Sequence, residues 1–134
     1  MKYISKELYP DYDHWFSDYQ PIIDYLGYVL LQVDDGNYQG DSRILYFSEG
    51  KFGYLQFGWG SCSGCDQLQA CDNYADVDKL ILELKKATRW FKDKEECQRY
   101  FETHDWEGDY SWNSEEQREF IERTKKILNA IIFT

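Results

Sequence analysis

Two cysteines three positions apart, Cys62 and Cys65, give this chain its clearest chemical signature. They belong to a stretch rich in glycine and serine, Gly58-Trp59-Gly60-Ser61-Cys62-Ser63-Gly64-Cys65-Asp66. Thiolates at this C-x-x-C spacing bind tetrahedral zinc, which needs four ligands in a structural site. Cys97 and His104 are the candidates for the other two. One hypothesis is therefore a zinc site formed by Cys62, Cys65, Cys97 and His104.

The same two thiols also have a redox interpretation and a purely structural one. At the start of a helix, the helix dipole lowers a thiol pKa and favours redox activity. Asp66 opposes this, because a nearby carboxylate raises the pKa of a thiol. Glycine-rich corners and apolar helix faces both accept a small thiol as filling. The sequence favours such structural cysteines with no cofactor, and a zinc-stabilised or thiol-active domain is the alternative.

No catalytic pattern is complete elsewhere in the sequence. The two histidines, His14 and His104, stand in no nucleophile-base arrangement. The chain contains neither the G-x-S-x-G nucleophile elbow nor the G-x-x-x-x-G-K-[ST] phosphate loop. We therefore expect a binding protein rather than an enzyme.

Acidic residues are concentrated in the first part of the chain. The net charge is -10, and residues 1–78 hold 13 Asp or Glu against four Lys or Arg, whereas residues 79–134 hold 12 against 11. Such a field repels nucleic-acid phosphates and attracts basic protein surfaces. We expect no direct contact with nucleic acid and a protein partner with a basic surface. The simpler alternative is that the carboxylates only keep the chain soluble.

The first third of the sequence also interleaves carboxylates with aromatic rings. Aromatic side chains dominate the energetics of interfaces, and carboxylates complement basic groups on a partner. The predicted partner-binding residues are Asp11, Tyr12, Asp13, Trp15, Phe16, Asp18, Tyr19, Asp34 and Asp35. For the aromatic residues among them, packing on the sheet is the competing interpretation. A third interpretation makes the aromatic segment 106–112 the wall of a ligand pocket.

Apolar patterning predicts strands first and helices afterwards. Residues 28–33 form an aliphatic run before a turn, and residues 43–47 and 52–57 flank a short connection that contains glycine. Three strands in series predict an antiparallel meander. Pro21 biases Gln20 away from helical geometry, so any helix before it should end there.

Capping patterns and 3.6-residue periodicity predict the helices. They are a short one from Ser63 to about Cys71, one that Asp76 caps and whose apolar face reaches Phe91, one that begins at Asp93, and a final one capped by Ser114. The expected fold class is α+β, a small antiparallel sheet of about three strands covered by helices from the C-terminal half.

Length and composition suit one domain spanning residues 1–134, with hydrophobic content of 43%. No apolar run approaches the length of a membrane span, and the first ten residues lack the apolar middle of a signal peptide. We expect a cytoplasmic protein that makes no membrane contact.

The glycine-cysteine stretch, together with Gln67-Leu68-Gln69-Ala70-Cys71 after it, resembles a motif of small uncharacterised proteins encoded by bacteriophages. In these proteins a G-x-G-S-C-S-G-C-D block likewise follows short strands. The match covers about 15 residues of the chain. The resemblance implies a phage accessory protein that acts in the cytoplasm of the host cell.

Together these features favour one function over the others. The expected protein binds and inhibits a host defence or nucleic-acid-handling protein, for example a nuclease, in the manner of an anti-CRISPR protein. Its acidic, aromatic surface would occupy the basic groups that otherwise hold phosphates, which is nucleic-acid mimicry.

Overall fold

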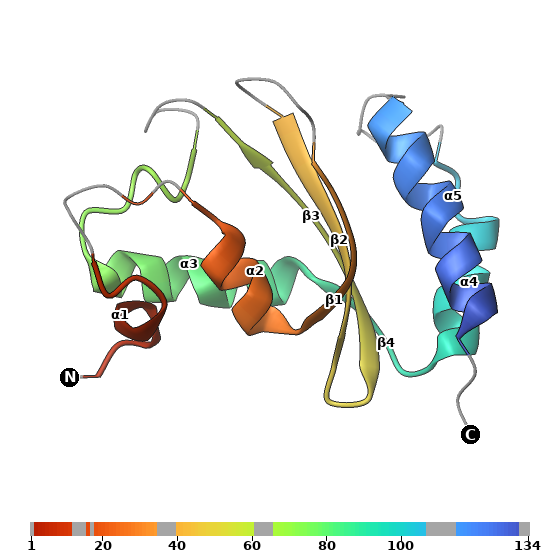
Figure 1. Ribbon diagram of the computed structural model, residues 1–134, viewed down its shortest axis with the longest axis horizontal. Helices are drawn as coiled ribbons and strands as arrows, with labels where there is room; N and C mark the ends of the chain where they lie inside the picture. The colour runs from red at the N-terminus through yellow and green to blue at the C-terminus, as the bar shows by residue number, and fades with distance from the viewer. Residues whose placement is uncertain are drawn as a thin grey trace.

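Helices cover both faces of a central antiparallel sheet (Figure 1). The computed structural model describes residues 2–11, 16, 18–34, 40–60, 66–106 and 115–131, and within these the chain forms five helices and four strands. In chain order they are α1 (Ile4–Leu8), α2 (Gln20–Leu26), β1 (Tyr28–Asp34), β2 (Gly40–Ser48), β3 (Lys51–Trp59), α3 (Tyr74–Ala87), β4 (Arg89–Phe91), α4 (Lys94–Thr103) and α5 (Glu115–Ala130). The predicted α+β class is confirmed.

The strands lie in the order β1-β2-β3-β4, each antiparallel to its neighbour. A two-residue turn joins β2 to β3, and both of its residues have positive φ, 53° at Glu49 and 81° at Gly50. Such turns match the twist of a hairpin. The predicted meander is therefore confirmed, with one strand more than the expected three or so in the part of the chain that the structure describes.

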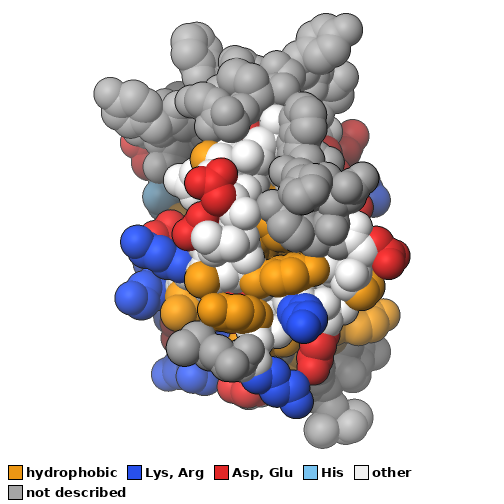
Figure 2. Space-filling view, turned by 90° about the vertical axis from the view of Figure 1, so that its left-hand side faces the viewer, with side chains coloured by type: hydrophobic (Ala, Val, Ile, Leu, Met, Phe, Trp, Pro, Cys, Tyr) orange, Lys and Arg blue, Asp and Glu red, His pale blue; other side chains and the backbone are white. Residues whose placement is uncertain are grey.

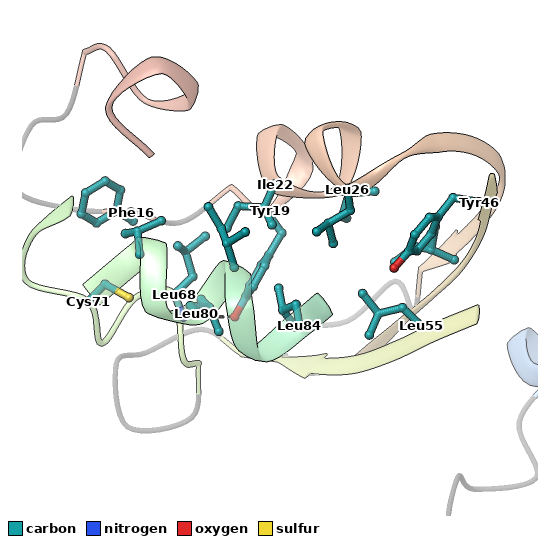
Figure 3. Close-up of a cluster of buried hydrophobic side chains, with 14 residues drawn as sticks. Phe16, Tyr19, Ile22, Leu26, Tyr46, Leu55, Leu68, Cys71, Leu80 and Leu84 are labelled. Atoms are coloured by element: carbon teal, nitrogen blue, oxygen red, sulfur yellow. Dashed lines mark hydrogen bonds between the residues drawn. The ribbon is translucent and has the colours of Figure 1, made fainter. Parts of the chain in front are cut away.

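Successive side chains along each strand point to opposite faces of the sheet, so the apolar ones form two cores, one on each face. We call them the first and the second core. On the first face, Ile44, Tyr46 and Leu55 pack against side chains of α2 and α3. Figure 3 shows Tyr46 and Leu55 from the sheet on the same side as Leu26 of α2 and Leu84 of α3, between the sheet and the two helices. On the second face, Leu45 and Phe52 pack against side chains of α4 and α5. In Figure 1 the two helical layers stand on opposite sides of the sheet.

Two expectations about helices are wrong, the non-helical geometry of Gln20 and the cap at Asp76. α2 begins at Gln20 with Pro21 in its first turn, because the first N–H groups of a helix need no partner within the helix and proline suits that position. α3 begins at Tyr74 rather than at Asp76, since the side chain of Asn73 accepts a hydrogen bond from the Asp76 N–H and caps the helix.

The predicted extension of α3 to Phe91 is also wrong. The helix ends at Ala87, and Thr88 is extended, with φ -69° and ψ 133°. Arg89–Phe91 then pairs with β3 as β4, which directs Phe91 into the second core. A stretch of three residues is too short to show a strand period in a sequence.

Of the other predicted helices, two are confirmed in part and one is replaced by a turn. Asp93 caps α4 through the Glu96 N–H, as predicted. The apolar face expected for α5 is confirmed, with Phe120 and Leu128 fully buried, and Ser114 lies outside the described residues. The predicted helix up to Cys71 is a turn over residues 67–70 in the part that the structure describes.

Gly53 allows the side chain of Trp90 to lie against the sheet. A Cβ atom at Gly53 would stand 2.9 Å from Trp90 Cζ3 and 3.0 Å from Thr88 Cγ2. In Gly53→Ala the new methyl group would clash with the Trp90 ring. We expect this overpacking to lower the free energy of unfolding by about 1–3 kcal/mol. Urea denaturation measures this. Gly58→Ala is the matched control, because its Cβ would meet no atom nearer than 3.4 Å; equal stability of the two variants would contradict the close contact.

Candidate functional site

A buried carboxylate organises the chain that follows β3. Asp66 is only 4% exposed, and its two oxygens accept four hydrogen bonds. The donors are the Tyr19 hydroxyl at 2.9 Å, the Leu68 N–H at 2.9 Å and the Gln69 N–H at 3.1 Å on Oδ1, and the Gly60 N–H at 3.0 Å on Oδ2. Buried carboxylates require this kind of compensation, because removing a charge from water is costly.

Tyr19 is the side-chain partner of Asp66. Burial is the main cause that raises the Tyr19 pKa above its ordinary value, so the hydroxyl keeps its proton at neutral pH and donates it to Asp66. The same oxygen accepts the Leu68 N–H at 3.1 Å. Tyr19 therefore connects the start of α2 to the turn after Asp66.

Hydrogen bonds between Gly60 and the following turn bring the end of β3 close to Asp66. Besides the bond to Asp66, the Gly60 carbonyl accepts the Gln69 side-chain amide at 2.7 Å. The five residues between Gly60 and Asp66, which include Cys62 and Cys65, lie outside the described residues. The two ends of this segment are thus fixed by the Asp66 carboxylate and the Gln69 amide.

Replacing Asp66 tests this arrangement. In Asp66→Asn the amide group presents N–H donors where the carboxylate accepts, so at least one backbone N–H loses its partner. We expect the free energy of unfolding to fall by about 2–4 kcal/mol. Asp11→Asn is the control, since Asp11 is exposed. Chemical denaturation of both variants gives the comparison, and an unchanged Asp66→Asn would show that the carboxylate is dispensable.

A cleft of about 430 Å³ opens beside Asp66 on the α2 face of the sheet. We call it the acidic cleft. It is formed by α2, the sheet and the turn, with Asp18, Tyr19, Gln20, Ile23, Gln32, Asp34, Ser42, Trp59, Gly60 and Asp66 as lining residues. Clefts of this size hold small molecules or a few side chains of a partner.

A backbone N–H and a side-chain amide hold two carboxylates of the acidic cleft, Asp18 and Asp34, in place. Gln20 and Gln32 form a reciprocal pair, each amide donating to the other at 3.0 Å. The Gln32 amide also donates to Asp34, at 3.0 and 3.2 Å, and the Asp18 carboxylate accepts the Gln20 N–H at 3.0 Å. Because an ionised carboxylate accepts about four hydrogen bonds, Asp18 and Asp34 keep capacity for a further donor.

The acidic cleft is negatively charged. Its lining residues include three aspartates and, among the residues described, neither lysine nor arginine. Arg43 follows Ser42 on β2, and alternation directs its side chain to the opposite face of the sheet, where it is fully buried. Elsewhere the charge is mixed: Figure 2, which shows the α1 end, has Lys and Arg side chains interspersed with Asp and Glu around a hydrophobic centre.

The predicted partner-binding residues lie in different environments. Asp18 and Asp34 are exposed and both line the acidic cleft, whereas Asp11 is exposed outside it. Phe16 and Tyr19 are 1% and 9% exposed and belong to the first core, so for these two the competing interpretation, packing on the sheet, describes their position. The remaining predicted residues, Tyr12, Asp13, Trp15 and Asp35, lie outside the described residues.

Several cleft residues were not among the predicted site residues. Gln32 interrupts an otherwise aliphatic run, and a polar residue in such a run is the sequence signal that marks it. Trp59 donates its indole N–H to the Ser42 hydroxyl at 3.0 Å, which fixes its ring at the cleft wall. The sequence indicated an effect of Asp66 on a neighbouring thiol, but no pattern indicated its contact with Tyr19, 47 residues away.

The two predicted metal ligands that the structure describes serve other contacts. Cys97 is fully buried in the second core. The His104 ring stacks on Tyr100 with 4.7 Å between centroids and meets the edge of Trp106 at 4.6 Å. Of the two residues that flank the cysteine segment, Asp66 bonds to Tyr19 of the first core and Gly60 bonds to Asp66. Within the described residues no cluster of metal-binding side chains occurs; Cys62 and Cys65 lie outside them, so the zinc site stays a prediction.

Both described cysteines are poor nucleophiles. Burial is the main cause that raises the pKa of Cys71 to about 11 and that of Cys97 to about 12. The Cys71 thiol also lies 3.3 Å from the Gln67 carbonyl, to which it donates.

We expect Cys71 and Cys97 to resist a disulfide reagent such as DTNB at pH 8 in the native protein. At that pH a thiol with a pKa of 11 is about one thousandth thiolate, and the thiolate is the reacting form. Peptide mapping by mass spectrometry after labelling, with guanidinium-unfolded protein as the control, should show both thiols modified at least about 100-fold faster when unfolded. Rapid labelling of Cys97 in native protein would contradict its burial.

Comparison with known proteins gives no match: neither a family model, nor a curated protein, nor a solved structure is significantly similar to this chain. Among the described residues, no helix has both the length and the apolar composition needed to cross a membrane.

Proposed function

We propose that this chain is a non-enzymatic binding protein whose acidic cleft accepts a basic group of a protein partner. The observation that supports this is the convergence of Asp18, Asp34 and Asp66 on one cleft that no described lysine or arginine lines. An arginine or lysine of the partner would complete the hydrogen bonds that Asp18 and Asp34 leave open.

Preorganisation strengthens the proposal. The Gln20 backbone N–H already holds Asp18 and the Gln32 side-chain amide holds Asp34, so binding does not have to order these exposed carboxylates. A guanidinium carries five N–H donors in a plane and pairs with a carboxylate through two of them. The cleft therefore suits arginine better than lysine.

The partner proposed from the sequence is a host defence or nucleic-acid-handling protein. Arginines that grip phosphates are exposed and basic, and an acidic protein that occupies them would inhibit the partner. The resemblance to phage proteins implies that this action takes place in the cytoplasm of a host cell. These parts of the proposal rest on the sequence and on charge complementarity.

The aromatic residues that contact the partner differ from those predicted from the sequence. Phe16 and Tyr19 are buried and unavailable as surface anchors. Trp59 is half-buried at the wall of the acidic cleft, where its ring could stack on an arginine side chain. We therefore assign the aromatic part of the contact to Trp59.

A hexa-arginine peptide is a defined probe for the cleft. We expect saturable binding, followed by NMR through the side-chain amide signals of Gln20 and Gln32, that weakens as salt is added. Asp18→Asn and Asp34→Asn keep an oxygen acceptor but remove the charge, and each should weaken binding by about two- to fivefold.

The control removes a carboxylate from the opposite side of the molecule. Glu122→Gln on α5 changes the net charge equally, and its side chain is 68% exposed. If Glu122→Gln weakens the peptide as much as Asp34→Asn, attraction is a property of the net charge and the cleft has no specific role. An affinity indifferent to salt contradicts the electrostatic mechanism.

A further inference from the structure

A second pocket lies at the other end of the same face of the sheet. It measures about 440 Å³ and is bordered by the end of α2, the β2–β3 turn, α3 and β4. We call it the aromatic pocket, and define it by Tyr25, Ser48, Glu49, Lys51, Lys85 and Trp90. Ser48 and Lys51 lie at the turn end of the β2–β3 hairpin. Ser42 and Trp59, which line the acidic cleft, lie at the other end of the same hairpin, so the two sites are distinct.

One wall of the aromatic pocket is a fixed indole ring. Trp90 lies over Gly53, where the absence of a Cβ lets the ring approach the strand. The edge of the ring meets Tyr46, with centroids 5.4 Å apart and planes at 87°. Tyr46 is itself fully buried and hydrogen-bonded to Thr88. Trp90 is nevertheless 38% exposed, so a held aromatic surface faces solvent.

The aromatic pocket is also lined by a second ring and a cation. Tyr25 is 40% exposed, and the Lys85 ammonium lies 5.2 Å from the centre of its ring. This cation–π contact keeps Lys85 beside the pocket. Lys51, the first residue of β3, is exposed and lines the same space.

The charge of the aromatic pocket differs from that of the whole chain. Two ammonium groups, Lys51 and Lys85, face one carboxylate, Glu49, in a protein of net charge -10. The Ser48 hydroxyl adds a neutral donor at the rim. Two exposed rings beside two lysines match a ligand that is both flat and anionic.

We propose that the aromatic pocket binds a mononucleotide, with the base on Trp90 and the phosphate between Lys51 and Lys85. Aromatic side chains stack on bases without sequence preference, and lysine is an ordinary phosphate partner. A single nucleotide fits the charge balance better than a strand does, because each further phosphate meets the negative field of the chain. The proposal does not depend on the function of the acidic cleft.

Titration with AMP, followed by NMR at the Trp90 indole N–H, tests the proposal. We expect a saturable shift of that signal, and at least tenfold weaker binding of adenosine and of inorganic phosphate, which each lack half of the recognised chemistry. Lys51→Ala and Lys85→Ala should each weaken AMP at least fivefold, and Trp90→Leu should abolish the binding.

Matched controls separate a site from general charge. Lys126→Ala removes an exposed cation from α5, on the other face of the sheet, and should leave AMP affinity unchanged. Should Trp90→Leu fail to fold, the two lysine variants still decide. The proposal is overturned by the absence of saturation with AMP, by inorganic phosphate binding as tightly as AMP, by lysine variants that bind normally, or by an eight-residue oligothymidylate binding more tightly than AMP.

Discussion

The described structure of the first core depends on one buried negative charge. The Asp66 carboxylate joins the end of β3, the start of α2 and the turn before α3 through four hydrogen bonds. A charge in such surroundings is stable only while its donors stay in place. The constraint therefore acts in both directions: the backbone needs the carboxylate for its N–H groups, and the carboxylate needs that backbone. The position of Tyr19, and with it the floor of the acidic cleft, follows from this requirement.

Sequence patterns identified the elements with strong local signals. The hairpin of β2 and β3 follows from strand residues on both sides of Glu49 and Gly50, and α4 follows from the cap at Asp93. Two of the errors have local causes, and the third has a tertiary one. Asn73 competed with Asp76 for the same cap, and Pro21 suits the first turn of a helix as well as the end of one. β4 has three residues and exists because β3 offers a free edge there, which is a tertiary cause that no periodicity reveals.

The candidate site was only partly accessible from sequence. Asp18 and Asp34 stood out through the excess of carboxylates, and they do border one cleft. The charge count could not show that the Phe16 ring is buried. An acidic, aromatic stretch has the same composition whether its rings face solvent or the core. The amides of Gln20 and Gln32 were invisible for a related reason: a hydrogen bond between residues 12 positions apart depends on how a helix lies across a strand.

The shortness of α2 has a consequence for both surfaces. Seven residues form too few hydrogen bonds to be helical alone, so α2 exists because Ile22, Ile23 and Leu26 are buried. Its first turn contributes Gln20 to one site and its last contributes Tyr25 to the other. Local unfolding of this single helix removes both at once, which makes α2 a cooperative unit in the sense of hydrogen exchange. Anything that binds at either end slows the opening of the whole helix and so preserves the distant end as well.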